Sequence, residues 1–295
     1  MGMFENFLPG RKAMRLAEAE REHAIKIAPS FIDEVTAPQV FHEEIPSMIE
    51  DVSSIITKTH EEKLLSKNEC IRSKKLKGSA NDVFLVSLDN AGSAIFKPSS
   101  GERVTIEGSG YKRECAAYFV DRFFGINLVP PTVLREINGE IGSLQRFIVG
   151  ARTGYEISRR EDENYSAYSE EEMIRMRIFD YIISNNDRGG ANYIVKNKRL
   201  YAIDHGLAFQ TRIYGCDNLF FYMGKRVPED ILVRTKKLLT SEKLTGLFTA
   251  ELSKYMEEQE VWGVMGRLDN LLNAFSQEPV LNREKIIGLR RYRTV

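Results

Sequence analysis

The stretch "NNDRGGANYIV", residues 185–195, ends an apolar helical run and returns at once to a strand-like pattern. It contains Asp187 and Asn192, five positions apart, and a second carboxylate, Asp204, follows in "LYAIDHGLAF". A loop followed by a short hairpin would bring these three side chains to one place. Carboxylate and amide oxygens are the ligands that Mg²⁺ prefers. The spacing therefore predicts a site that combines a bound metal ion with a reactive carboxylate.

Protein kinases have the same spacing. They place a catalytic Asp and a metal-binding Asn in the pattern D-x-x-x-x-N, and a second metal-binding Asp ends the hairpin that comes next. One Asp meets the acceptor hydroxyl, while the Asn and the other Asp converge on magnesium held by the nucleotide phosphates. Asp, Asn and Gly also cluster in ordinary turns for backbone reasons, so "DRGGAN" alone would not decide the question.

Two charged residues upstream add to the pattern. Lys97 stands near the end of the apolar strand "AIFKP", where the kinase lysine that contacts the α and β phosphates stands in "VAIK". Glu114 follows seventeen residues later in the helical "KRECAAYFVD" and is placed to pair with Lys97. Each alone is more often a solvated surface charge. The four elements in kinase order together favour a kinase site.

A segment that covers the nucleotide phosphates is expected at residues 76–86, "LKGSANDVFLV". Gly78 and Ser79 lie there between two strand-like runs, although the segment is not a G-x-G-x-x-G loop.

The surrounding pattern predicts the elements that hold these residues. Residues 1–69 are expected to form an N-terminal helical extension, since 11–28 and 45–66 have helical apolar spacing. Residues 70–150 are expected to form a β-rich lobe, and 151–295 a mainly helical lobe. The predicted elements are strands at 82–88, 93–98, 131–137 and 142–149, a helix at 111–125, and a strand pair within 192–204. The predicted fold class is α+β, a two-lobed protein-kinase-like fold.

Four segments carry a more specific resemblance: "SAIFKP", "AAYFVDRFFGINLVPPTVL", "FDYIISNNDRGGANYIVK" and "LYAIDHGLAF". Together they resemble the phosphatidylinositol 3-/4-kinase-like superfamily, most of all the type II phosphatidylinositol 4-kinases and their small prokaryotic relatives. The resemblance covers roughly residues 76–275, about two thirds of the chain. Its most specific parts are the two aspartate loops, where His205 occupies a variable middle position.

The resemblance implies a role for each polar residue and implies ATP and Mg²⁺ as cofactors. Lys97 would hold the nucleotide phosphates and Glu114 would orient Lys97. Asp187 would be the catalytic carboxylate, and Asn192 with Asp204 would bind magnesium.

The segment that touches adenine would fall in "LQRFIV", residues 144–149. It contains Gln145, Phe147 and Ile148, which the resemblance makes candidate nucleotide-binding residues.

Composition limits the partners and the compartment. The 295 residues carry 42 Lys plus Arg and 42 Asp plus Glu, so no net positive field points to nucleic acid or to an anionic membrane. The three cysteines show no zinc or disulfide spacing. No apolar run is long enough to span a membrane, and the start lacks the core of a signal peptide. A cytoplasmic protein without a stable membrane anchor is expected.

The acceptor is left open between two classes. The cysteine-rich palmitoylated insertion of the animal type II lipid kinases has no counterpart here. The segment "NLFFYMGKRVP", residues 218–228, would either enter a bilayer with its aromatic residues or pack them into the helical lobe. A protein Ser/Thr acceptor is slightly favoured over a phosphoinositide. A nucleotide-binding pseudokinase or adaptor is the third alternative, and the oligomeric state stays open.

Overall fold

The computed structural model divides the chain into two units, residues 1–47 and 48–295. The residues that it describes are 57–76, 79–103, 109–159, 167–210 and 216–290. All of them belong to the second unit. The helix predicted at 11–28 and the candidate phosphate-binding Gly78 lie outside the described residues.

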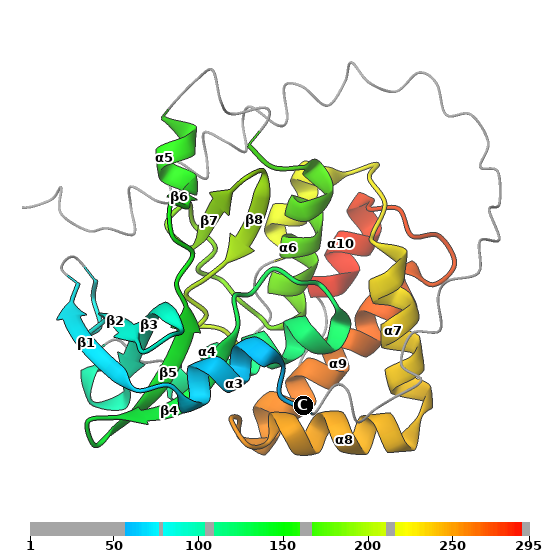
Figure 1. The fold of residues 1–295 in the computed structure, drawn as a ribbon. Coiled ribbons are helices and arrows are strands. Elements are labelled where there is room, and N and C mark those ends of the chain that lie inside the picture. The colour runs from blue at the N-terminus through cyan, green and yellow to red at the C-terminus, as the bar shows by residue number, and fades with distance from the viewer. Residues whose placement is uncertain (1–56, 77–78, 104–108, 160–166, 211–215, 291–295) are drawn as a thin grey trace, which may run out of the picture. The chain divides into compact units, whose positions relative to one another are not determined.

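A five-stranded antiparallel sheet forms one part of this unit (Figure 1). Its spatial order is β1-β2-β3-β5-β4. The strands are β1 (Cys70–Lys75), β2 (Phe84–Leu88), β3 (Gly92–Pro98), β4 (Thr132–Ile137) and β5 (Glu140–Arg146). The hairpin predicted from "DVFLVSL" and "SAIFKP" is confirmed. The pair β4–β5 is joined at Asn138 and Gly139, which both have positive φ, as a tight hairpin turn requires.

One face of this sheet is covered by helix α3 (His60–Lys67). Leu65 of α3 is fully buried in a cluster with Val86, Phe96 and Leu144. Because strand side chains alternate between faces, Phe96 points to α3 and Lys97 points to the opposite face. The C-terminal end of the segment predicted to be helical at 45–66 thus packs on the sheet face opposite to Lys97.

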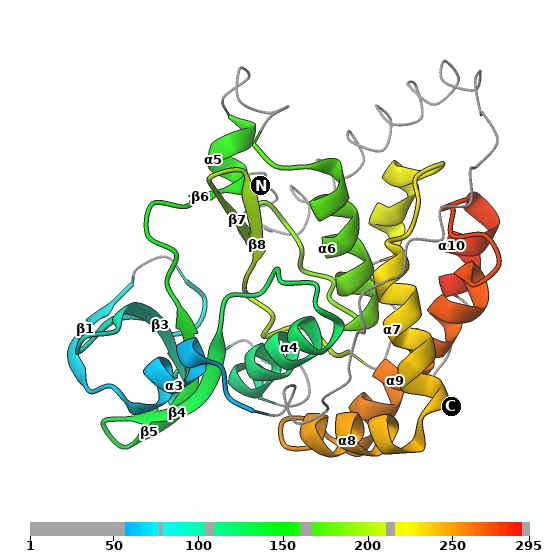
Figure 2. The ribbon, with the colours of Figure 1, turned by 45° about the vertical axis from the view of Figure 1, so that its right-hand side comes forward.

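Helix α4 (Gly110–Phe124) connects the sheet to the helical part of the unit. It contacts β4 and β5, while its Phe123 stacks edge-on against Phe248 with ring centroids 4.7 Å apart. The helix ends at Gly125, which has a left-handed φ of 61°. Its backbone N–H donates to carbonyl groups of the last helical turn. Figure 2 shows α4 lying between the five-stranded sheet and α6 and α7.

The remainder is mainly helical, as predicted. Its helices are α5 (Gly154–Ser158), α6 (Glu170–Ile182), α7 (Glu229–Thr240), α8 (Glu242–Leu252), α9 (Glu258–Phe275) and α10 (Arg283–Arg290). Short 3-10 helices occur at Ser99–Gly101 and Asp217–Tyr222. None of the helices in the described ranges is both long enough and apolar enough to cross a membrane.

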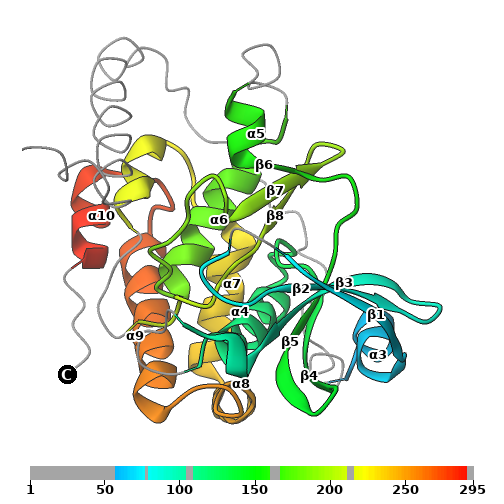
Figure 3. The same ribbon diagram turned by 90° about the vertical axis from the view of Figure 1, so that its left-hand side faces the viewer.

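A second, three-stranded sheet has the order β6-β7-β8, with β6 (Arg152–Thr153), β7 (Tyr193–Lys196) and β8 (Arg199–Ala202). The hairpin β7–β8 confirms the strand pair predicted within 192–204. Figure 3 shows the linker that leaves β5 and reaches β6, so this linker joins the two sheets.

Helix α3 should contribute to the stability of the sheet although it lies outside the kinase-like motifs. Leu65→Ala removes a fully buried side chain and should lower the free energy of unfolding by about 2–5 kcal/mol. The matched control is Lys63→Ala, an exposed position on the same helix, which should change it by no more than about 0.5 kcal/mol. Urea unfolding followed by circular dichroism measures both, and equal effects would contradict the packing of α3.

Candidate active site

Three charged side chains from three segments meet on the face of the sheet opposite α3. The Lys97 ammonium on β3 forms ion pairs with Glu114 on α4 and with Asp204, which lies just after β8. The distance from Lys97 Nζ to Asp204 Oδ1 is 2.8 Å. The sequence prediction that Glu114 is placed to pair with Lys97 agrees with this geometry.

Burial and charge act in opposite directions on this cluster. Burial alone would lower the pKa of Lys97, but the carboxylates of Asp204 and Glu114 raise it above its ordinary value. Burial alone would raise the pKa of Glu114, but Lys97 and the neighbouring His205 hold it below its ordinary value. Both groups are therefore charged at neutral pH, and Lys97 presents a full positive charge with its side chain 22% exposed.

Glu114 has a second partner. Its Oε2 accepts a hydrogen bond of 3.0 Å from the backbone N–H of His205. This bond fixes the chain next to Asp204, whose backbone has a left-handed φ of 60°. Such a φ is uncommon for residues other than Gly and is tolerated best by Asp and Asn. Glu114 therefore positions both Lys97 and the segment that carries Asp204.

The loop after α6 places Asp187 and Asn192 in contact. The Asn192 amide nitrogen donates to Asp187 Oδ2 over 3.0 Å and to the Asp187 backbone carbonyl. Burial and the negative charge of Asp204 raise the pKa of Asp187 above its ordinary value. Since the amide nitrogen of Asn192 is engaged with Asp187, its carbonyl oxygen is the atom left to bind a cation.

Arg188 was not singled out by the sequence, yet it holds this loop. Its guanidinium pairs with Asp180 over 2.9 Å, and both side chains are 1% exposed. It also donates to the carbonyl of Asn192 and, over 2.7 Å, to the carbonyl of Ile203. Arg188 thus connects the two candidate metal-binding segments, since it bonds to Asn192 and to Ile203, the residue before Asp204. The only signal in the sequence was an Arg beside the candidate catalytic Asp.

Asn185 completes this support. Its side-chain amide donates to Asp180 Oδ1 over 2.8 Å, and its own oxygen accepts from the Asp187 backbone N–H over 3.2 Å. The buried Asp180 carboxylate is thereby bound by both an arginine and an amide. These bonds fix the buried side of the loop, while the Asp187 side chain stays exposed.

The candidate nucleotide-contacting residues lie on β5 and its exit. Gln145 pairs in register with Ile95, so it shares the sheet face of Lys97, and its amide donates to Thr132 Oγ1 over 2.9 Å. Phe147 is partly exposed, and its N–H donates to the Ser93 carbonyl over 3.1 Å. Ile148 is half-buried in the linker to β6. The described part of the candidate phosphate-covering segment includes Ser79, which is exposed between β1 and β2.

The donor set fits magnesium bound together with a nucleotide. No group of three or more His, Cys, Asp or Glu side chains suited to a metal ion occurs in the described ranges. Asn192 and Asp204 supply one amide oxygen and one carboxylate instead. Mg²⁺ commonly takes one or two protein ligands and completes its shell with waters and substrate phosphates. A metal that binds only with its nucleotide therefore suits these residues.

Comparison with known proteins finds one distant relative in sequence and solved structures with a similar fold. No described protein family matches the sequence. Protein Rv2133c of Mycobacterium tuberculosis is 26% identical over 217 residues, which is 61% of this chain and 76% of the relative. The structure of hydra Fam20 with sugar superposes with a TM-score of 0.54 at 18% identity, covering 73% of this chain and 87% of that one. A Golgi casein kinase with Mn/ADP bound has a TM-score of 0.49 at 16% identity, covering 78% and 75%, a likeness too distant to support an argument.

The chain therefore has a protein-kinase-like fold, with a mixed arrangement of sheet and helices. The fold class expected from the sequence is confirmed. At 18% identity the likeness defines the fold alone, so the chemistry has to be argued from the residues of this chain.

Arg188 should be essential to the stability of the loop. Arg188→Ala leaves the Asp180 carboxylate buried beside fewer partners and should lower the free energy of unfolding by about 3–5 kcal/mol. Arg103→Ala is the matched control, since the Arg103 side chain is 65% exposed in its ion pair with Asp82 and its loss should lower the free energy of unfolding far less. Urea unfolding compares the two. Equal losses would show that the buried pair does not hold the loop.

Proposed function

We propose that the protein is an ATP- and Mg²⁺-dependent kinase that transfers the γ-phosphate of ATP to a hydroxyl acceptor. The observation that carries this proposal is the meeting of Lys97, Glu114 and Asp204 in one cluster, with Asp187 bonded to Asn192 on the neighbouring loop. Residues 70–150 and 151–295 form the two lobes. Within the fold, "DRGGAN" and "DHGLAF" favour the phosphatidylinositol 3-/4-kinase-like superfamily.

Lys97 binds the nucleotide phosphates. Its ammonium is held by Glu114, which is charged and buried, so the cation has little freedom to leave this position. A charge held in advance costs little reorganisation when the phosphates arrive. A magnesium ion on Asn192 and Asp204, when bound, would supply further positive charge for the phosphates.

Asp187 faces the acceptor. Its Oδ2 accepts from Asn192, which orients the carboxylate and leaves its other oxygen to accept the hydroxyl proton of the acceptor. Little covalent chemistry is required of the protein in phosphoryl transfer, so positioning and charge neutralisation supply most of the catalysis. The raised pKa of Asp187 makes it a somewhat stronger base than an ordinary aspartate.

A protein Ser/Thr hydroxyl is the favoured acceptor. Within residues 218–228, Leu219 is fully buried, and Phe220 and Tyr222 pack against the helical core. Most of the apolar surface that a membrane contact would need is thereby used inside the protein. Phe221 and Met223 are 41% and 46% exposed, and these two side chains are the observation that favours a phosphoinositide acceptor instead. A pseudokinase is disfavoured, because nucleotide binding alone does not need Asp187.

Asp187→Ala should abolish transfer without unfolding the protein. The side chain is exposed, and a general base contributes roughly 10²–10⁴-fold to a rate. The assay incubates wild type and variant with labelled ATP and Mg²⁺, offering a protein extract or phosphoinositide vesicles as acceptor. Nucleotide affinity, measured by calorimetry, should stay within about threefold of wild type.

The matched control for that experiment is Asp89→Ala, an exposed aspartate in the β2–β3 turn, which should transfer at the wild-type rate. Transfer by Asp187→Ala near the wild-type rate would remove Asp187 from its role. Labelling of vesicle lipid, with no labelling of protein, would establish the phosphoinositide acceptor.

Asp204→Asn should weaken the binding of ATP in the presence of Mg²⁺ by about tenfold or more, because a neutral amide replaces the carboxylate that faces the metal. Asn192→Ala should weaken it less, since a neutral ligand is lost. Calorimetry with Mg²⁺ and again with a chelator separates the metal-dependent part. Unchanged affinity in both variants would show that the metal binds elsewhere.

A further inference from the structure

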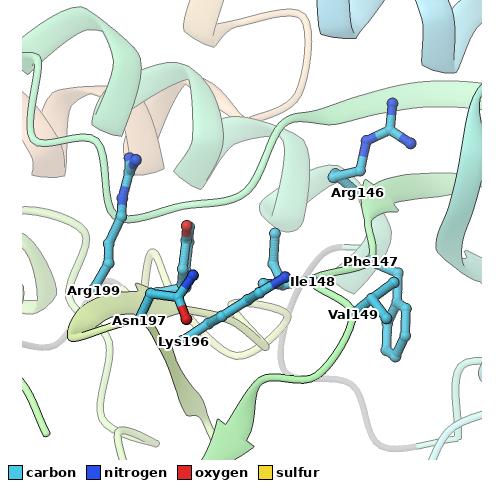
Figure 4. Close-up of a pocket in the computed structure, with 8 residues that line it drawn as sticks. Arg146, Phe147, Ile148, Val149, Lys196, Asn197 and Arg199 are labelled. Carbon is cyan, nitrogen blue, oxygen red and sulfur yellow. The ribbon is translucent and has the colours of Figure 1, made fainter.

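A cavity of about 530 Å³ lies beside the linker that joins the two sheets (Figure 4). One wall is the end of β5 and the linker, residues 146–149. The other wall consists of Lys196, Asn197, Arg199 and Tyr201 from the β7–β8 hairpin. We call it the hinge cavity. Ligand pockets commonly have volumes of about 300–1,000 Å³, so it is large enough for a small organic molecule.

The hairpin wall carries two cations, Lys196 and Arg199. Lys196 and Arg199 are directly opposed in the antiparallel register of β7 and β8, so their side chains leave the same face of the hairpin. Like charges in that relation destabilise a hairpin. None of the eight described residues that line the hinge cavity is acidic. An anion in the cavity would relieve this repulsion.

The two cations differ in what holds them. Arg199 donates to the Asn127 carbonyl over 3.1 Å, and its guanidinium lies 5.1 Å from the centre of the Tyr201 ring. Both contacts restrict the position of its guanidinium. Lys196 has no side-chain hydrogen bond or ion pair with any residue in the described ranges. In Figure 4 its side chain extends across the cavity toward Ile148.

Three of the four residues of the opposite wall are apolar. Phe147 and Val149 are 36% and 62% exposed, although large apolar side chains are usually covered. A third cation, Arg146, stands at the end of this wall and pairs with Glu61 over 2.6 Å. An apolar wall opposite a pair of cations is complementary to a molecule with an anionic group at one end and an apolar body at the other.

The hinge cavity shares Phe147 and Ile148 with the candidate nucleotide-contacting segment but includes none of the charged residues of the candidate active site. Lys97, Glu114, Asp187 and Asp204 are all absent from its lining. Arg146 pairs in register with Ala94, so its side chain lies on the α3 face of the sheet, opposite to Lys97. A ligand there would contact the linker from another direction than a nucleotide on Lys97.

We propose that the hinge cavity is a second ligand site, which binds a small organic phosphate. The phosphate group lies between Lys196 and Arg199, and the apolar body lies against Phe147 and Val149. A phosphate provides the oxygens for both cations at once, and Arg199 can bind it through two N–H groups. The same chemistry occurs in soluble aryl or alkyl phosphates and in the headgroup of an anionic phospholipid.

The test uses the full chain and calorimetry with 1-naphthyl phosphate, in phosphate-free buffer without nucleotide. The wild type should bind one molecule per chain. Lys196→Ala should weaken binding by about tenfold or more, because it removes one charge-assisted partner of the phosphate. Lys198→Ala is the matched control: it lies in the same basic run, is exposed and does not line the hinge cavity, so its affinity should equal that of wild type. Lys97→Ala should also bind as wild type does.

A second arm separates the two sources of phosphate. Wild type and Lys196→Ala are sedimented with vesicles of phosphatidylcholine containing phosphatidate. Sedimentation that depends on Lys196 would support the site and assign it to a lipid headgroup, whereas binding of 1-naphthyl phosphate with no sedimentation would assign it to a soluble phosphate.

Three results would overturn the proposal. The first is the absence of binding in both arms. The second is an equal loss in Lys198→Ala, which would indicate diffuse charge attraction. The third is an equal loss in Lys97→Ala, which would place the probe in the candidate active site. Because no arm requires phosphate transfer, these results are independent of the kinase assay.

Discussion

The buried carboxylate of Glu114 is the constraint on which the candidate active site depends. It comes from α4, it pairs with Lys97 of the five-stranded sheet, and it accepts the backbone N–H of His205 beyond the second sheet. A carboxylate that is 2% exposed stays ionised only if it is paired with a cation and hydrogen-bonded. Its burial therefore forces the sheet, α4 and the Asp204 segment into one arrangement.

The Arg188–Asp180 pair acts in the same way on the other side of the site. Arg188 bonds to the carbonyls of Asn192 and Ile203, so the two segments that would supply metal ligands are fixed to one guanidinium. A planar guanidinium can serve a carboxylate and two carbonyls together, which an ammonium could not do with the same geometry. The site thus rests on two buried ion pairs, one of which supports the phosphate-binding side and the other the metal-binding side.

The sequence indicated the polar residues that the structure brings together better than it indicated the residues that support them. Asp187, Asn192 and Asp204 were recognisable because the elements that carry them are short, and spacing along the chain translates into position. The pairing of Arg188 with Asp180 could not be recognised, because an Arg and an Asp eight residues apart in the sequence give no sign of burial. The packing of α3 was missed because helical periodicity identifies an apolar face without its partner. The opposition of Lys196 and Arg199 required the register of β7 and β8.

Exposure separates the polar residues that support the candidate active site from those that are open to a substrate. Asp180, Arg188 and Glu114 are between 1% and 2% exposed and are bonded to each other or to the backbone, whereas the Asp204 side chain is 55% exposed. His205 extends this logic: its ring is fully buried against Phe179, with Nδ1 3.6 Å from Glu114 Oε2. Burial lowers the pKa of His205, which favours the neutral form of the ring at neutral pH. Lys97 therefore remains the cation that balances the charge of Glu114, and the exposed Asp204 pairs with Lys97 from the open side of the site.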